Sequence, residues 1–313
     1  MPVFLLKRLA GAAVVLFVVS VITFGLSLLV PGDPAVHIAG EHATRAEIAA
    51  VRTGLGLDQP VAVRYVSWAA AALSGDLGTS LYNSQPVTEI LAERLPVTLS
   101  LALAAMAVAV LISIPLGTLA ALRPGGRLDR VISSGTALAV ATPSFWLGLL
   151  LILALAITYP LFPATGYRPV GDGFGAFSAH LALPALTLGL AAAVEPTRQL
   201  RAALADVLET DYVRTARAKG LLAVTVLRKH ALRNAAVPYV TVIGLETGQL
   251  LGGAVVVETV FGLPGLGTLA ESTVTRQDLP VLQGIVIAST LVVVAANLAA
   301  DLAYRWLTPG EAA

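Results

Sequence analysis

The chain contains no cysteine, and this absence excludes several kinds of chemistry at once. Disulfide bridges, thiolate metal sites and cysteine nucleophiles all require that residue. The histidines lie on different segments and match no metal-ligand spacing such as HExxH; they are His37, His42, His180 and His230. The GxSxG motif is missing, as is a Gly-rich phosphate loop ending in Lys-Ser or Lys-Thr. We therefore expect no catalytic residue, metal or cofactor in this chain, and no ATP hydrolysis by it.

Charged residues are scarce as well. They make up 12% of the sequence, against roughly 25% in a soluble domain. Hydrophobic residues make up 57%, and the mean hydropathy is +0.83. A water-soluble fold could not hide this much apolar surface, whereas a lipid bilayer is itself apolar. The formal net charge of +1 gives no indication of nucleic-acid binding. These values predict an all-α polytopic membrane protein, with room for about six transmembrane helices.

Apolar runs that are free or nearly free of charge recur along the sequence and predict the spans of a single transmembrane domain, 1–313. The first run, Leu9–Val30, has 22 residues without a charge. A cleaved signal peptide would have an apolar region of about 7 to 15 residues, so we expect an uncleaved first helix. The fourth run meets Glu195-Pro196 early and must be short or continue as an amphipathic helix. We expect spans at about 9–30, 97–122, 131–158, 181–204, 235–257 and 279–306.

The distribution of Lys and Arg predicts the orientation, because these residues favour the cytoplasmic side. With the N-terminus inside, the inner segments hold 14 of the 20 basic residues. Four of the six on the outer side lie in the segment 31–95, and long loops have little weight in this rule. We therefore predict that both termini are cytoplasmic and that 31–95 is an extracytoplasmic loop containing short surface helices.

The inner loop, 205–233, carries the pattern of a short helix. Asp211 is suited to capping it, and Gly220 to ending it in a left-handed conformation. Arg214 and Arg217 are three residues apart and share one face, and Ala216 is small. Such a helix could dock in a groove of a soluble partner, with Ala216 at close approach. An ordinary basic cytoplasmic loop would show much the same composition.

Two acidic residues fall in or near the fifth span. Glu246 lies close to its middle and Glu258 close to its outer end. A charge in the bilayer costs several kcal/mol on insertion scales, so it usually faces a cavity or another helix. Glu246 could line a pore or carry a proton, or form a hydrogen bond inside the bundle. Glu258 precedes the turn Phe261-Gly-Leu-Pro-Gly265, which favours a structural role.

Several motifs together resemble one family. Asp211-Tyr-Val-Arg-Thr-Ala-Arg-Ala-Lys-Gly220, followed by His230-Ala-Leu-Arg-Asn-Ala-Ala-Val-Pro238, is similar to the EAA-type loop of the dipeptide/oligopeptide/nickel permease family of ABC importers. The resemblance extends in order through almost the whole chain. It includes Pro31-Gly-Asp-Pro34, Gly75-Asp-Leu-Gly-Thr-Ser80, Arg94-Leu-Pro-Val-Thr-Leu99, Val257-Glu-Thr-Val-Phe-Gly-Leu-Pro-Gly-Leu-Gly267 and Asn297-Leu-Ala-Ala-Asp301.

This resemblance implies a type I ABC importer permease, the first of the two that such systems use, in a bacterial cytoplasmic membrane. Its implied partners are a second, homologous permease, two cytoplasmic ATPase subunits that bind ATP and magnesium, and an extracytoplasmic substrate-binding protein. Residues 211–220 would be the coupling helix. The residues implied in contact with the ATPase are Asp211, Tyr212, Arg214, Thr215, Ala216, Arg217, Lys219 and Gly220.

Two features depart from the family pattern. The Glu-Ala-Ala positions read Arg214-Thr215-Ala216, as is usual in this branch, and the basic C-terminal tail is replaced by Leu307-Thr-Pro-Gly-Glu-Ala-Ala313. We expect import of di- or oligopeptides or a similar small solute. The same fold could instead import nickel, a metallophore or a sugar. A proton-coupled secondary transporter using Glu246, or a membrane scaffold, are the alternatives from other classes.

Overall fold

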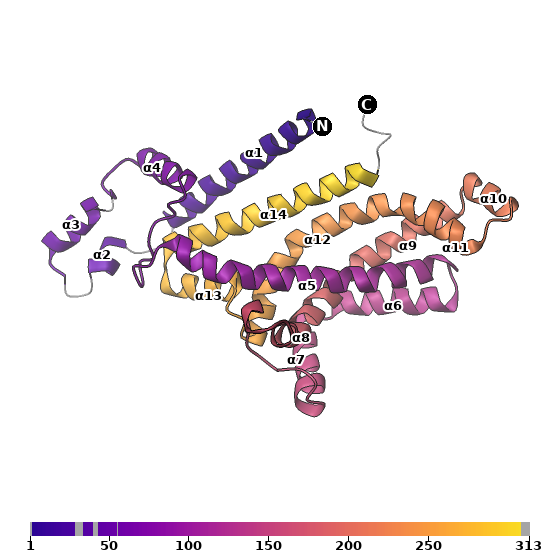
Figure 1. The fold of residues 1–313 in the computed structure, drawn as a ribbon. Helices are drawn as coiled ribbons and strands as arrows, with labels where there is room; N and C mark the ends of the chain where they lie inside the picture. The colour runs from indigo at the N-terminus through magenta and orange to yellow at the C-terminus, as the bar shows by residue number, and fades with distance from the viewer. Residues whose placement is uncertain (1, 29–33, 40–42, 55, 308–313) are drawn as a thin grey trace. The chain divides into compact units, whose positions relative to one another are not determined.

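The computed structural model describes residues 2–28, 34–39, 43–54 and 56–307, and this part of the chain is helical between its turns. The all-α class is therefore confirmed (Figure 1). Across these ranges the β-type pairing is limited to one isolated bridge, between Thr79 and Pro86. Most of the predicted Pro31-Gly-Asp-Pro34 motif, His42 and the altered tail from residue 308 onward lie outside the described residues.

The helices follow one another with short connections. In chain order they are α1 Pro2–Ser27, α2 Pro34–Ala39, α3 Arg45–Gly54, α4 Val61–Leu73, α5 Val87–Ala121, α6 Arg127–Ala141, α7 Ser144–Ile152, η1 Leu153–Thr158, η2 Val170–Asp172, α8 Phe174–Ala192, α9 Val194–Leu208, α10 Asp211–Ala218, α11 Ala223–Thr225, η3 Val226–Ala231, α12 Leu232–Phe261, α13 Leu266–Arg276 and α14 Leu279–Leu307.

Within the described ranges, five helical stretches are long and apolar enough to cross a membrane: Leu6–Ser27, Val87–Ala121, Phe174–Ala192, Ala223–Phe261 and Leu279–Arg305. A sixth crossing is available from α6 together with α7 and η1, which are bent by 101° at their junction. The bend falls at Thr142-Pro143. Thr142 has an extended backbone (φ −95°, ψ 119°), because a residue before proline avoids the helical region. The run predicted over 131–158 is thus two segments rather than one straight helix.

The fourth predicted span, 181–204, also differs from the structure in its limits. The helix α8 begins at Phe174, and α9 follows it after Ala193. The early Glu195-Pro196 pair occupies the first turn of α9, where the missing N–H of proline costs no helical hydrogen bond. Apolar α8 therefore continues into amphipathic α9, which is one of the two outcomes that the sequence allowed.

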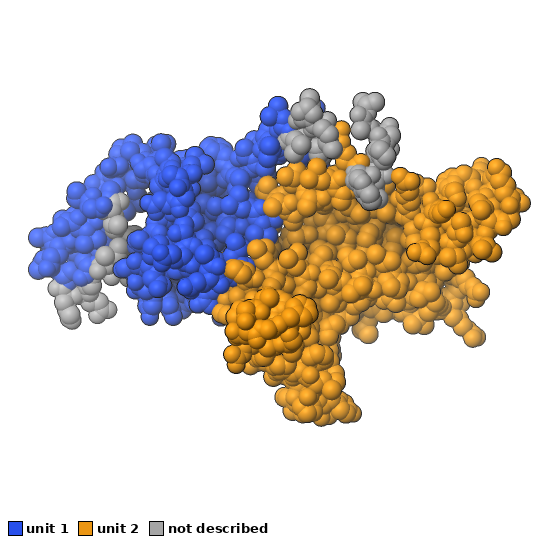
Figure 2. Space-filling view, in the orientation of Figure 1, with its two compact units in different colours: residues 1–95, 269–292 blue, residues 96–268, 293–313 orange. Residues whose placement is uncertain are grey.

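The chain forms two compact units, 1–95 with 269–292 and 96–268 with 293–313 (Figure 2). The core of the second unit is built from α5, α8 and α12, and Leu101, Leu183 and Phe261 are among its fully buried side chains. The helices approach closely at Gly189 of α8, where a Cβ would lie 2.6 Å from the Ala105 carbonyl oxygen. Small residues allow such close packing in membranes, where apolar burial alone gives helices little reason to associate.

The first unit contains an aromatic group that joins α1 to α4. The rings of Phe24 and Tyr65 are 5.5 Å apart between centroids, and Trp68 lies 5.7 Å from Phe24. The Ser20 and Tyr65 hydroxyls are hydrogen-bonded at 2.8 Å. In the same unit, the Ser80 hydroxyl and the Leu81 N–H both donate to the buried carboxylate of Asp278. These contacts hold α4 on α1 and the Ser80–Leu81 backbone on Asp278.

Candidate functional site

The candidate coupling helix, α10, starts after Thr210 rather than at a cap formed by Asp211. The Thr210 carbonyl accepts the N–H groups of Val213 and Arg214, and the Thr210 hydroxyl donates to the Val207 carbonyl at 2.6 Å. Asp211 is the first helical residue, so its negative charge lies at the positive end of the helix dipole. The boundary expected from the sequence is therefore displaced by one residue.

The inner face of α10 packs against its own chain. Val213 and Ala216 are buried with Val226 of η3, and Val207 and Leu208 of α9 lie against them. Ala216 retains 7% exposure. Ala216 therefore helps to hold α10 on α9 and η3 within this chain, and its close contact with a partner remains a prediction.

The end of α10 has the conformation that the sequence indicated. Gly220 has φ +78°, and its N–H donates to the Arg217 carbonyl at 2.9 Å. The Leu221 N–H donates to the Ala216 carbonyl at 3.3 Å. A residue with a Cβ is strained at this φ, which accounts for a glycine here.

The outer face of α10 is exposed. Exposed side chains on this face are those of Tyr212, Arg214, Thr215 and Arg217. Just beyond the helix, Lys219 is also exposed, and Leu222 is 75% exposed. Arg214 pairs with Asp211 at 3.3 Å, but both groups are on the surface, where such a pair adds little stability. Asn234 of α12 donates to the Tyr212 hydroxyl at 2.7 Å and steadies that ring. The helix thus presents a cationic surface with both polar and apolar side chains, while its other face is packed against α9 and η3.

The helix α9, which carries α10, is fixed to the turn between α5 and α6. Arg201 forms a two-point ion pair with Asp129, one contact of which measures 2.6 Å. The Gly125 N–H donates to the same carboxylate at 2.8 Å. The side chain of Asp129 is 4% exposed and that of Arg201 is 35% exposed, so the carboxylate is shielded from water while the guanidinium is partly open to it. Sequence reasoning missed this pair, because these residues are 72 positions apart: Asp129 falls between two expected spans and Arg201 falls within the expected span 181–204.

Glu246 lies on α12 and is 8% exposed within this single chain. Glu195 lies on α9, which packs against α12. Two acidic groups on neighbouring helices, one of them buried in this chain, are compatible with a polar path or with a site completed by another helix. The pore-lining role of Glu246 remains a prediction.

Glu258 closes the turn between α12 and α13. Its carboxylate accepts the Thr98 hydroxyl at 2.6 Å, the Gly267 N–H at 2.7 Å and the Thr268 N–H at 3.2 Å. The residue is fully buried, and the Thr98 hydroxyl in turn accepts the Leu266 N–H at 2.8 Å. A carboxylate at the N-terminus of α13 satisfies backbone donors that would otherwise lack partners. The structural role favoured from the sequence agrees with this geometry, while the part of Thr98 was missed.

The helical arrangement is a fold found in solved ABC importers. One solved structure of that class, the inward-facing MetNI methionine ABC transporter, has the same fold, with a TM-score of 0.59 and 20% identity. The match covers 70% of this chain and 96% of that one. A second form of MetNI matches with a TM-score of 0.55.

The family is shown directly by sequence comparison. Residues 113–312 match the binding-protein-dependent transport system inner membrane component, and residues 1–102 match the N-terminal membrane component of such systems. The chain belongs to this family of transport permeases. Its membership implies ATPase and binding-protein partners in general, and it favours the ABC class over a proton-coupled carrier or a scaffold.

Several transport permeases are similar to this chain over nearly their full length. A probable peptide ABC transporter permease, y4tP of Sinorhizobium fredii, is 38% identical, with 99% of both chains covered. The oligopeptide transport system permease AppB of Bacillus subtilis is 36% identical, again with 99% of both covered. The glutathione transport system permease GsiC of Salmonella choleraesuis is 41% identical, over 98% of this chain and 97% of the relative.

Proposed function

We propose that this chain is one of two different permease subunits of a bacterial peptide importer and that it forms half of the path through the cytoplasmic membrane. The observation that carries this proposal is the exposed, cationic face of α10 on a helix whose other face is held by α9 and η3. Two ATPase subunits would receive α10 and its counterpart, and a binding protein would deliver cargo from outside. ATP and magnesium would be bound by the ATPases.

The contact with the ATPase is assigned to the outer face of α10. Arg214, Arg217 and Lys219 would donate charge-assisted hydrogen bonds to the partner, and these are stronger than neutral ones. Tyr212, Thr215 and the exposed Leu222 would add packing area. Asp211, Ala216 and Gly220 would act within this chain by setting the start, the support and the end of the helix.

The proposed cargo is a di- or oligopeptide. The support is that the relatives above are named for transport of peptides, oligopeptides and glutathione. In vesicles containing the assembled importer, we expect uptake of a labelled dipeptide to be abolished by excess unlabelled dipeptide. Excess nickel or sugar should leave uptake unchanged. Absence of dipeptide uptake, together with uptake of labelled nickel or a labelled sugar by the same vesicles, would contradict the peptide assignment in favour of those cargoes.

Orientation is proposed from the distribution of basic residues, with both termini in the cytoplasm. Because the chain lacks cysteine, single cysteines can report the side of the membrane. Ser84 precedes α5 and Ala218 ends α10, and both are exposed. In intact cells we expect an impermeant maleimide to label Ser84→Cys and not Ala218→Cys. Labelling of Ala218→Cys alone would reverse the proposed topology.

A further inference from the structure

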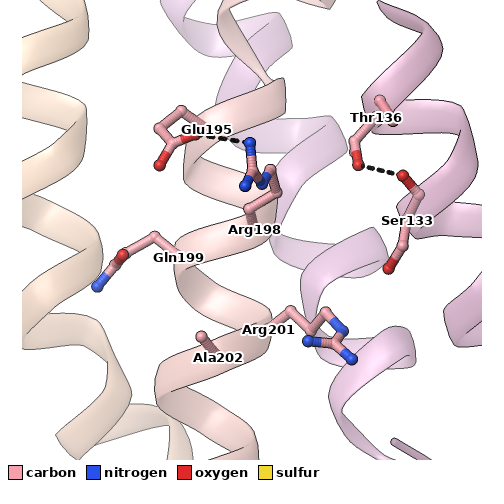
Figure 3. A pocket seen from close by; sticks show the side chains of 8 residues that line it. Ser133, Thr136, Glu195, Arg198, Gln199, Arg201 and Ala202 are labelled. Atoms are coloured by element: carbon pink, nitrogen blue, oxygen red, sulfur yellow. Dashed lines mark hydrogen bonds and ion pairs between the residues drawn. The ribbon is translucent and has the colours of Figure 1, made fainter. Parts of the chain in front are cut away.

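A polar hollow lies between α6 and α9, in the second unit, and has no role in the coupling proposal. Its cavity volume is about 530 Å³, within the range of roughly 300–1,000 Å³ typical of small-ligand sites. Figure 3 shows side chains that line it: Ser133 and Thr136 of α6 are joined by a hydrogen bond, and Gln199 of α9 points to the side away from them. The lining residues are Ser133, Thr136, Ala137, Glu195, Arg198, Gln199, Arg201 and Ala202.

The hollow is on the side of α9 opposite the residues that are buried in the core of the unit. Thr197, Leu200 and Leu204 are buried against the rest of the unit. Glu195, Arg198 and Ala202 recur at the helical spacing of three and four residues on the opposite side. Because α9 continues directly from the apolar helix α8, this charged face starts near the end of a membrane crossing. Charged groups there are expected to face water or another polar surface rather than lipid.

The charges in the hollow are held to different degrees. Arg201 is fixed by the two-point pair with the buried Asp129. Arg198 and Glu195 are joined by a single contact of 3.6 Å, and their side chains are 61% and 53% exposed. An exposed pair of this kind is weak and exchanges readily with other partners. The hollow therefore offers one cation and one anion that a ligand can engage. The neighbouring hydroxyls of Ser133 and Thr136 already donate, to Asp129 at 3.3 Å and to the Ser133 carbonyl at 2.9 Å, so they remain available only as acceptors.

We propose that this hollow is a binding station on the transport path for the charged ends of a zwitterionic cargo. Arg198 would take a carboxylate and Glu195 an ammonium group, each replacing the weak contact between them. This proposal rests on the proposed import of peptides, whose free termini carry these two charges. A lipid phosphate could supply the same anionic chemistry to Arg198, but a single phosphate would leave the Glu195 carboxylate without a cationic partner.

The first experiment measures how the charges of Arg198 and Glu195 affect the reactivity of a thiol in the hollow of the assembled complex. Ala202 lies one turn from Arg198, so Ala202→Cys places a thiol beside that cation. We expect an anionic methanethiosulfonate to react faster than a cationic one by about threefold, relative to a free thiol, as expected for one unit charge at this range in water. Arg198→Gln should remove this preference, and Glu195→Gln should increase it. A preference that neither substitution changes would overturn the assignment of these two residues.

The second experiment uses alanyl-alanine as the probe, in proteoliposomes of the same complex. We expect the dipeptide to slow modification of Ala202→Cys at least about threefold, and its C-terminal amide to protect less. Arg123→Cys, in the turn after α5 and outside the hollow, should show no protection. Protection that instead follows the fraction of phosphatidylglycerol, with no effect of dipeptide, would overturn the proposal in favour of lipid.

The two proposals fail in different ways. An absence of dipeptide uptake by the wild-type complex would overturn the proposed cargo and, with it, this assignment of the hollow. Normal dipeptide uptake without protection of Ala202→Cys would overturn the role of the hollow alone. In that case Arg198→Gln should also leave the KM for dipeptide uptake unchanged, whereas the proposal predicts a raised KM.

Discussion

ATP-driven uptake is expected to be lost almost completely in the double variant Arg214→Glu, Arg217→Glu. Both side chains lie on the exposed face of α10, while Val213 and Ala216 hold the opposite face. Each charge-assisted hydrogen bond to a partner is typically worth about tenfold in affinity, and reversal adds repulsion. We therefore expect ATPase recruitment to weaken by at least about 100-fold, measured by co-purification, with normal amounts of the permease in the membrane.

Two comparisons make this result specific. Arg127→Glu, Arg130→Glu carries the same change in charge on exposed residues of α6, and it should keep most uptake. Ala216→Trp, in contrast, overfills the packed inner face of α10 and should reduce the amount of folded protein. Normal uptake and ATPase recruitment by the α10 double variant would contradict the assignment of this surface.

The second large effect is expected at Glu258. Replacement by Ala removes the acceptor of three hydrogen bonds and leaves the N–H groups of Gly267 and Thr268 without that partner in a buried turn. Buried donors left unsatisfied cost about 1–3 kcal/mol each. We expect Glu258→Ala to lower the free energy of unfolding by about 2–4 kcal/mol, measured by denaturant titration of the purified protein.

Two variants separate this effect from the loss of any carboxylate. Glu258→Gln keeps one oxygen acceptor in nearly the same volume and should be intermediate in stability. Glu93→Ala removes an exposed acidic residue of α5 and should change the free energy of unfolding by less than about 0.5 kcal/mol. Equal stability of Glu258→Ala and the wild type would show that this network does not hold the turn.

Much of the fold could be predicted from the sequence because membrane helices leave a strong local signal. A run of about 20 uncharged residues needs no partner segment to be recognised. The exact ends and breaks of the helices were harder to predict, and the run over 131–158 shows why. Thr142-Pro143 is a local signal for a break in this apolar stretch, because the residue before proline avoids the helical region. The angle of 101° is given only by the backbone geometry.

The candidate site was predicted where its signal is local and missed where it is not. Gly220 and the two arginines of α10 are visible in a window of ten residues. The inward direction of Ala216 is different, because it depends on Val226 and on α9, which meet α10 only in the folded chain. The Asp129–Arg201 pair and the Thr98–Glu258 contact likewise join segments 72 and 160 residues apart.

The most direct measurement of the central claim is the energy source for uptake. Proteoliposomes should contain this permease, its second permease and the ATPases, with the binding protein and labelled dipeptide on the side opposite the ATPases. We predict uptake when ATP and magnesium are supplied to the ATPases, and none with a proton gradient alone. Uptake that is driven by the proton gradient in the absence of ATP would contradict the account.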